Sequence, residues 1–289
     1  MGVTGFIGKE LPALLAYRGA RVTGVSRSGK GTVHGVDLWQ TPEKLDLSGH
    51  STVINLAGER IDQRWTQENR RKFYESRVEF TRDLVNHLRE LPENDRPRLL
   101  INGSAVGYYG NREDEILQES STPGSGYLAE LCKEWEDAAC EAEKFGVRVI
   151  TLRTGVVLGK GGPAFQKLTA AFKLRLGGKL GNGQQWMPWI HVEDLRAAIV
   201  HAVGSETLAG PVNGVAPTPE RNIDFTHKLA AAIHRSAVFS VPAFALKLAL
   251  GDFASALLEG QHALPVALEK DGFTFQFPSL ESALTDLVG

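Results

Sequence analysis

The chain has 289 residues, of which 42% are hydrophobic and 23% are charged, and its formal net charge is −2 at pH 7. The apolar fraction is sufficient for a buried core, which excludes a wholly disordered chain. Thirty-two basic residues against thirty-four acidic ones leave no excess of positive charge for binding nucleic acid. We therefore expect a folded protein of one or two domains that does not bind nucleic acid.

Cysteine usage and hydropathy set the expected compartment. The two cysteines, Cys132 and Cys140, cannot form a disulfide framework and lack the spacing of a metal site. No apolar run approaches the roughly 20 residues that span a bilayer, and no secretory signal precedes the first motif. The sequence predicts a cytoplasmic protein with no metal site and no membrane partner.

The first motif is a glycine-rich turn, G-x-x-G-x-x-G, over residues 2–8. Glycines at these places permit a tight turn and a close approach of the backbone to a pyrophosphate. The helix that follows, with Leu11, Leu14 and Leu15 on its apolar side, would direct its positive end at the phosphates. Such a loop followed by strand–helix units favours a dinucleotide site over the alternative, a glycine-rich turn with no ligand.

A strand should come before this loop, and only Met1 precedes Gly2. A parallel sheet without its first strand leaves the buried edges of two neighbouring strands unpaired, which is costly. We expect the structure to lack or to borrow this strand. The carboxyl ends of the next two strands should still lie toward the glycine loop.

Residues 21–25 form the next predicted strand, which ends at Ser26 and Arg27. An NAD site usually places an acidic residue here, where it accepts hydrogen bonds from the ribose 2′-hydroxyl. Arg27 can instead pair with a 2′-phosphate, and Ser26 can donate to it. This pair favours NADP, and the alternative is an arginine that is only solvated.

Further strands are predicted at residues 52–56, 99–102 and 147–152, with helices at 70–91 and 128–145 between them. Strand–helix alternation at this spacing predicts a doubly wound parallel sheet. Gly146 is placed to end the second helix. Glu130, Glu134 and Glu136 read as a solvated face of that helix.

Glycines become frequent after Leu158, which marks a change of organisation. We expect residues 1–160 to form the dinucleotide-binding domain, with a return through about 186–216. Residues 161–185 and 217–289 would form a smaller substrate domain over the carboxyl edge of the sheet. The last fifty or so residues read as a helical module.

Taken together, these motifs resemble the extended short-chain dehydrogenase/reductases, the nucleotide-sugar epimerases and dehydratases. More narrowly, the chain is similar to the atypical "epimerase family" proteins, which end in a small domain of unknown function. The motifs that carry the resemblance are residues 2–8, 55–58, 104–110, 152–159, 181–191 and 258–265.

The resemblance implies a Rossmann fold and an NADP site, with residues carried over only where the motif matches. Gly2, Thr4, Gly5, Phe6, Ile7 and Gly8 match the phosphate loop, and Ser26 and Arg27 match the 2′-phosphate pair. The remaining implied cofactor contacts are Leu56, Ala57, Gly58, Arg77 and Val156.

Members of that family typically use a serine or threonine, a tyrosine, and a lysine four residues after the tyrosine. Ser104 fits the serine place. Tyr127 is followed by Leu131 at the lysine place, and the nearest lysine is Lys133. At about 100° per residue, residues six apart lie roughly 240° around a helix, so Tyr127 and Lys133 cannot address one atom together. We expect a degenerate catalytic site, with Tyr127 equally suited to line a substrate pocket or to pack.

Two further side chains could face a substrate. Trp186 could line a pocket, although core packing explains it too. His191 could donate a proton, but a lone histidine is weak evidence, and a structural role is the stronger interpretation. Asp194 is expected to cap the helix that follows it.

Two functions from different classes remain open. The first is an NADP-dependent oxidoreductase or epimerase-like enzyme with a small, unidentified substrate, which could form homo-oligomers. The second is a non-catalytic NADP(H)-binding sensor or partner-binding protein. The fold alone does not decide between them.

Overall fold

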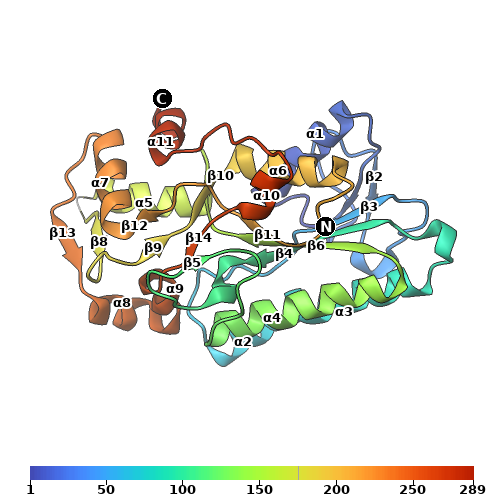
Figure 1. The fold of residues 1–289 in the computed structure, drawn as a ribbon, viewed down its shortest axis with the longest axis horizontal. Helices are drawn as coiled ribbons and strands as arrows, with labels where there is room; N and C mark the ends of the chain where they lie inside the picture. Colours follow the sequence, from blue (N-terminus) through green and yellow to red (C-terminus); the bar gives the residue numbers. More distant parts are fainter. Residues whose placement is uncertain (175) are drawn as a thin grey trace.

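A sheet of four parallel strands lies at the centre of the molecule, in the order β11, β6, β4 and β3 (Figure 1). The computed structural model describes residues 1–174 and 176–289. In β4, Leu99 lies opposite Thr52 of β3 on one side and Arg148 of β6 on the other. The prediction of a parallel sheet is confirmed. Its strands are Thr52–Asn55 (β3), Leu99–Ala105 (β4), Arg148–Thr154 (β6) and Gly210–Gly214 (β11).

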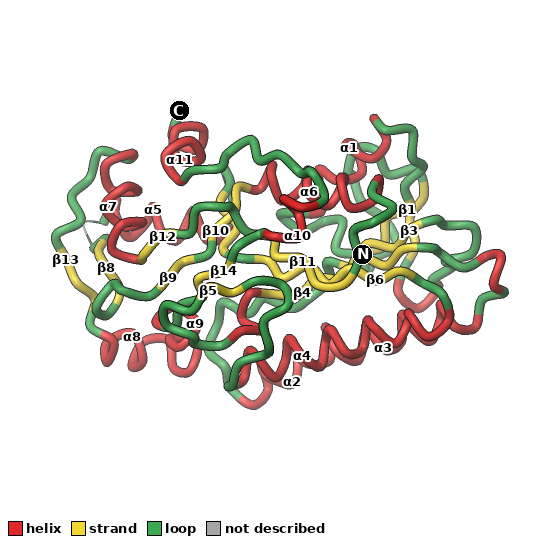
Figure 2. The backbone as a smooth tube through the Cα atoms, viewed as in Figure 1, coloured by secondary structure: helices red, strands yellow, loops and turns green. Residues whose placement is uncertain are grey.

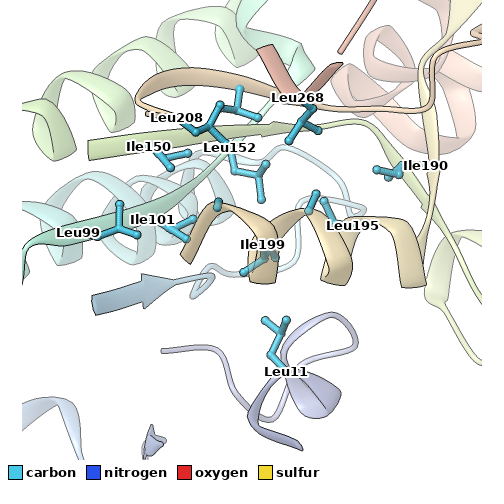
Figure 3. Packing of buried hydrophobic residues seen from close by; sticks show 13 residues of the cluster. Leu11, Leu99, Ile101, Ile150, Leu152, Ile190, Leu195, Ile199, Leu208 and Leu268 are labelled. Atoms are coloured by element: carbon cyan, nitrogen blue, oxygen red, sulfur yellow. The ribbon is translucent and has the colours of Figure 1, made fainter. Parts of the chain in front are cut away.

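Helices cover both faces of this sheet (Figure 2). Because side chains alternate along a strand, Leu100 of β4 packs against α3 (Phe80–Glu90) and α4 (Tyr127–Cys140). Its neighbours Leu99 and Ile101 pack on the other face against α6 (Val192–Gly204). Figure 3 shows this second cluster, which Leu11 and Leu268 extend from outside the sheet. The doubly wound architecture is therefore confirmed.

Two predicted helices differ in detail from the structure. The helix expected at 70–91 begins earlier and is divided: α2 (Gln67–Tyr74) continues through a π-helical turn, Glu75–Glu79, into α3. The helix expected at 128–145 is α4 followed by a 3-10 turn, Glu141–Phe145. Gly146 ends it in the left-handed conformation with φ of 86°, as predicted.

The strand predicted at 21–25 is β1 (Thr23–Val25), and it pairs with β2 (Leu38–Gln40) rather than with the central sheet. Across residues 1–174 and 176–289, no strand lies between β1 and β3. The strand expected before Gly2 is therefore not among the described elements.

The second half of the chain forms a smaller assembly at the far end of the sheet (Figure 1). Here α5, α7 and α11 share one apolar cluster that includes Phe165, Phe225 and Leu284. The last fifty residues do not stay within this assembly, because Leu268 packs in the sheet's own cluster. The helices and strands of the second half that have not yet been given, together with β5 (Ile116–Leu117), are Val156–Leu158 (β7), Pro163–Lys173 (α5), Gly178–Leu180 (β8), Trp186–Met187 (β9), Trp189–His191 (β10), Glu220–Arg221 (β12), Asn222–Ala232 (α7), Phe239–Val241 (β13), Ala243–Leu250 (α8), Ser255–Leu258 (α9), His262–Ala263 (β14), Val266–Lys270 (α10) and Leu280–Val288 (α11). Of the helices in the described ranges, none has the length and apolarity needed to cross a membrane.

Candidate cofactor and substrate site

The glycine loop lies against the carboxyl end of β3. Met1 donates its amino group to the carbonyl of Ile54 at 2.6 Å, and its own carbonyl accepts from the amide of Leu56 at 3.2 Å. Gly2 has a φ of +75°, and a Cβ there would lie 2.7 Å from the carbonyl carbon of Leu56. Only glycine fits this approach, so the loop and the Leu56–Ala57 turn lie together as the motif predicts.

The loop is tightened further where it enters the first helix. A Cβ on Gly8 would lie 2.3 Å from the carbonyl oxygen of Gly2, and the amide of Gly5 donates to that same oxygen at 3.0 Å. Thr4 and Gly5 are exposed at the tip of the loop. A 3-10 turn, Gly8–Glu10, then leads into α1, Leu11–Tyr17. This is a backbone cradle of the kind that accepts a pyrophosphate.

Two more loop residues are fixed by α6. Arg196 donates to the carbonyls of Phe6 at 2.7 Å and Ile7 at 3.1 Å, and its side chain is 4% exposed. A Cβ on Gly159 or on Gly162 would lie 2.6 Å from the Phe6 ring, so the ring packs directly against both glycines. The loop conformation is therefore held by the rest of the fold before any ligand binds.

Arg77 lies beside the Leu56–Gly58 turn, in the π-helical turn between α2 and α3. A Cβ on Gly58 would lie 3.1 Å from its guanidinium carbon, and Arg77 donates to the carbonyl of Glu59 at 2.9 Å. Burial lowers the pKa of Arg77 from its ordinary value. Single π-helical turns inside α-helices often occur at functional sites, and this one places a desolvated positive charge at the predicted cofactor turn.

Ser26 and Arg27 follow β1 in a turn. The Ser26 hydroxyl donates to the carbonyl of Lys30 at 3.0 Å, and Arg27 is exposed. Val25 lines the same cavity as Gly8 and Leu56, so the end of β1 lies toward the glycine loop as expected. The turn places Arg27 where its guanidinium is accessible to a ligand.

Ser104 lies at the end of β4 and is 6% exposed. Its hydroxyl donates to Glu136 Oε1 at 2.5 Å, and Glu136 also accepts two hydrogen bonds from Arg153, at 2.9 and 2.8 Å. The expectation that Glu136 belongs to a solvated helix face is wrong, since it is 7% exposed. Glu130 and Glu134 are exposed, as predicted.

Arg153 connects Glu136 to two tyrosines in this network. Its guanidinium lies 3.5 Å from the centroid of the Tyr108 ring and donates to the Tyr109 hydroxyl at 3.0 Å. Burial opposes its charge, but the hydrogen bond and attraction from Glu136 outweigh burial and raise its pKa above the ordinary value. Sequence reasoning missed Glu136 and Arg153 because they lie seventeen residues apart and meet only when α4 packs on β6.

Tyr127 and Lys133 lie on different sides of α4 and have different partners. The Tyr127 ring packs on Trp65 at 5.2 Å between centroids, with Arg70 over its face at 4.4 Å. Its hydroxyl donates to the carbonyl of Arg70 at 3.4 Å, and burial raises its pKa. Lys133 is on the exposed side, 2.6 Å from Asp137.

Trp186, expected either to line a substrate pocket or to pack, is partly buried and contacts three other side chains. His262 stacks on one face at 3.9 Å and Arg221 lies over the ring at 4.4 Å. Its indole N–H donates to Asp114 at 3.0 Å. The residue thus contacts both the C-terminal segment, through His262, and β12, through Arg221.

His191 is 2% exposed and caps α6, since its Nδ1 accepts from the amide of Glu193 at 3.3 Å. Its Nε2 lies 3.4 Å from Asp286, and burial lowers its pKa. These contacts support the structural role favoured from the sequence over proton donation to a substrate. The expected cap, Asp194, instead accepts from the amides of Gln276 and Phe277 at 2.7 and 2.9 Å.

Val156 begins β7, beside β10. Its amide donates to the carbonyl of Pro188 at 2.8 Å, so this backbone N–H has a partner within the protein. The residues that the structure does bring together are the glycine loop, the Leu56–Gly58 turn, Arg77 and the end of β1. Gly2 contacts the Leu56–Ala57 turn, Arg77 contacts Gly58, and Val25 at the end of β1 lines one cavity with Gly8 and Leu56.

Comparison with known proteins agrees with this geometry. Residues 1–213 match the NAD dependent epimerase/dehydratase family, and residues 241–287 match a domain of unknown function, DUF1731. Because the first match covers most of the chain, the chain belongs to the NAD dependent epimerase/dehydratase family.

Particular relatives match nearly the whole length of this chain. The chain is 38% identical to "Epimerase family protein SDR39U1 homolog, chloroplastic" of Arabidopsis thaliana, with 98% of this chain and 84% of that protein covered. It is 34% identical to "Epimerase family protein YfhF" of Bacillus subtilis, with 99% and 96% covered. The crystal structure of human epimerase family protein SDR39U1 with NADPH has a TM-score of 0.89 at 33% identity, with 99% and 97% covered. The resemblance to the atypical epimerase family proteins is confirmed.

Proposed function

We propose that this chain binds NADP and acts as an oxidoreductase or epimerase-like enzyme on a small polar substrate. One observation carries the proposal: Gly2 and Gly8 make contacts too close for any side chain, beside the Leu56–Ala57 turn. That cradle suits a pyrophosphate, because backbone amides can approach it without a Cβ between them. The NADPH in the human relative's structure supports the choice of ligand.

The residues at the two ends of the cradle would set the cofactor's orientation. Arg27 would pair with the 2′-phosphate and Ser26 would donate to it, while Arg77 would lie by the Leu56–Gly58 turn. When bound, the nicotinamide would supply hydride transfer, and the protein would supply orientation and electrostatics.

Ser104 remains our candidate for contact near the nicotinamide. Because its proton is donated to Glu136, its hydroxyl can accept a hydrogen bond but cannot donate one to a substrate oxygen. The catalytic proton transfer typical of such enzymes would therefore need another group. The catalytic site is degenerate because it lacks a group placed to transfer this proton. Tyr127 and Lys133 would not replace the usual tyrosine–lysine pair.

A second function is favoured by the same observations. Tyr127, Lys133 and Ser104 are all engaged by protein groups, which supports a non-catalytic NADP(H)-binding protein that senses redox state or binds a partner. Cofactor binding is common to both proposals, so turnover decides between them.

The experiment has two stages. Ligand that co-purifies with the protein is identified by mass spectrometry, and carbonyl compounds and nucleotide sugars are then screened for turnover with NADPH. Turnover that disappears in Gly8→Ala, whose Cβ would collide with the Gly2 carbonyl, supports the enzyme. NADPH that is retained while no compound turns over supports the binding protein.

A further inference from the structure

Exposed hydrophobic side chains gather at one end of the molecule. Of the eleven large hydrophobic side chains that are exposed in residues 1–174 and 176–289, six lie in or next to α5, β8, β13 and α8, and they are 51–80% exposed. Figure 1 shows β8, β13 and α8 at the end of the molecule opposite β2. We call these six residues the apolar end: Leu174, Leu176, Val238, Phe239, Phe244 and Leu248.

The helix α8 has no polar face that would explain its exposure. Seven of its eight residues are hydrophobic, and Lys247 is the other. Leu246 is buried on one side of the helix, whereas Phe244 and Leu248, one turn apart, are exposed. A helix that is apolar on all sides is normally buried on all sides. α8 therefore presents an apolar face that none of the described residues covers.

The apolar end is as large as a protein interface. β13 pairs in parallel with β8, and Pro242 alone separates β13 from α8. Together the six side chains offer on the order of 700 Å² of apolar surface, and a standard interface buries roughly 800 Å² per partner. The largest apolar patch of a typical monomer is about 300–600 Å² and is often functional. This area favours a binding role over incidental exposure.

The stretches that form the apolar end contain no acidic residue. Neither residues 144–192, which include α5 and β8, nor residues 225–251, which include β13 and α8, contain Asp or Glu. Lys167 and Lys228 of these stretches pair with acidic residues from elsewhere in the chain. Other cations here have no ion-pair partner among residues 1–174 and 176–289, and these are Lys173, Lys179, Arg235 and Lys247. The apolar end therefore lies beside uncompensated positive charge, which attracts acidic groups.

This charge disfavours a second copy of the chain as the occupant. Two apolar ends in contact would bring unpaired cations against unpaired cations, and like charges across an interface are costly. An occupant that carries negative charge would instead neutralise them. Both an anionic bilayer and an acidic polypeptide meet this requirement.

The free edge of β13 distinguishes these two occupants. Val241 accepts from the amide of Gly181 at 2.9 Å, on the side of β8. Because backbone groups alternate along a strand, those of Val238 and Ser240 point away from β8, where no described strand pairs with them. Hydrocarbon cannot bond to such groups, whereas another polypeptide can. This edge favours a polypeptide.

We propose that the apolar end is a docking surface for an acidic, amphipathic segment of another protein. Apolar side chains of that segment would cover Phe239, Phe244 and Leu248. Its carboxylates would pair with the cations beside them, such as Lys247, and its backbone would bond to the edge of β13. This inference does not rest on NADP binding or on turnover.

The test starts from a display library of random peptides about 12 residues long, selected on the full chain. We expect enrichment of peptides that combine Asp or Glu with Leu, Ile or Phe. A fluorescein-labelled peptide of the enriched sequence should bind with a Kd at or below roughly 100 μM, measured by anisotropy. Because charge contributes, raising the salt from about 50 to about 500 mM should weaken binding several-fold.

Matched variants locate the binding. The double variant Phe244→Ser with Leu248→Ser should weaken the labelled peptide at least about tenfold, whereas Tyr17→Ser, at a 90% exposed position of α1, should not. Lys247→Glu should weaken it several-fold, and Lys44→Glu, at another exposed lysine, should not. All four positions are exposed, so circular dichroism should show unchanged folding.

Three results would overturn the proposal. The first is a library that enriches no acidic, apolar peptide, or one whose binding survives the Phe244 and Leu248 double variant. The second is a dimer in analytical ultracentrifugation that the double variant dissociates, which would assign the apolar end to a second copy. The third is binding to vesicles of phosphatidylserine and phosphatidylcholine that the double variant removes, with no enriched peptide, which would assign it to a bilayer.

Discussion

Replacing Glu136 by glutamine tests whether the Ser104–Glu136–Arg153 network is a structural element of this fold. The side chains of Glu136 and Arg153 are 9% and 3% exposed, and two hydrogen bonds join them. Glutamine keeps the shape, but it removes the charge and replaces one accepting oxygen with a donating amino group. One of the two Arg153 donors then faces another donor.

The expected loss of stability follows from that geometry. Removing one partner of a buried ion pair costs roughly 3–5 kcal/mol, because the other charge stays buried without compensation. Tyr109 and the carbonyl of Glu119 still accept from Arg153, at 3.0 and 3.1 Å, which places the expected loss near the lower end of that range. For a chain of this size, a loss of about 3 kcal/mol lowers the thermal midpoint by roughly 6–12 °C.

Unfolding is followed by circular dichroism with heat and with urea. The matched control is Glu130→Gln, on the same helix at an exposed position, which should change stability by less than about 0.5 kcal/mol. If Glu136→Gln lost no more than its control, the network would not stabilise the fold. Ser104 would then be free for another role.

Three further predictions concern the loop, the tyrosine and a buried histidine. Gly8→Ala should lower NADPH affinity at least about 100-fold with secondary structure intact, because its Cβ would lie 2.3 Å from a backbone oxygen. Titration with NADPH measures the affinity, and circular dichroism measures the secondary structure. Unchanged affinity would contradict the assignment of the glycine loop to the cofactor. Once a substrate is identified, Tyr127→Phe should reduce turnover far less than the roughly 10²- to 10⁴-fold expected from losing a general acid. Turnover that is abolished while NADPH affinity is unchanged would instead show that Tyr127 acts as the catalytic acid. Because burial lowers the pKa of His191, the unfolded chain binds more protons below about pH 6.5, so stability should fall as pH drops through that value. His191→Asn keeps a capping group and should flatten this pH dependence in urea unfolding, whereas an unchanged slope would assign it to other groups.

Local patterns predicted much of the fold. β3, β4 and β6 contain short runs of apolar residues, a pattern typical of buried strands. Gly146 ends its helix because only glycine adopts the left-handed conformation without cost. The glycine loop was predictable for the same reason, since its spacing reflects backbone contacts rather than side-chain partners. These features depend on residues close together in the sequence.

Features that depend on distant partners could not be predicted. Glu136 has the pattern of a solvated helix residue until Arg153 arrives from β6. Asp194 holds the stretch at Gln276 and Phe277, more than eighty residues away, and this leaves the cap of α6 to His191. The short strands β2 and β9 have too few residues to show a period, and their pairing is decided by tertiary contacts.

The most direct test of the central claim compares the affinities of NADPH and NADH, measured by intrinsic tryptophan fluorescence. We predict that NADPH binds at least tenfold more tightly, and that Arg27→Ala removes most of this preference, because a bidentate phosphate contact contributes on the order of 2 kcal/mol. Arg18→Ala, an exposed arginine after α1, should leave the preference unchanged. Equal affinities in the unaltered protein, or a preference that survives Arg27→Ala, would contradict the assignment of this edge of the sheet to NADP.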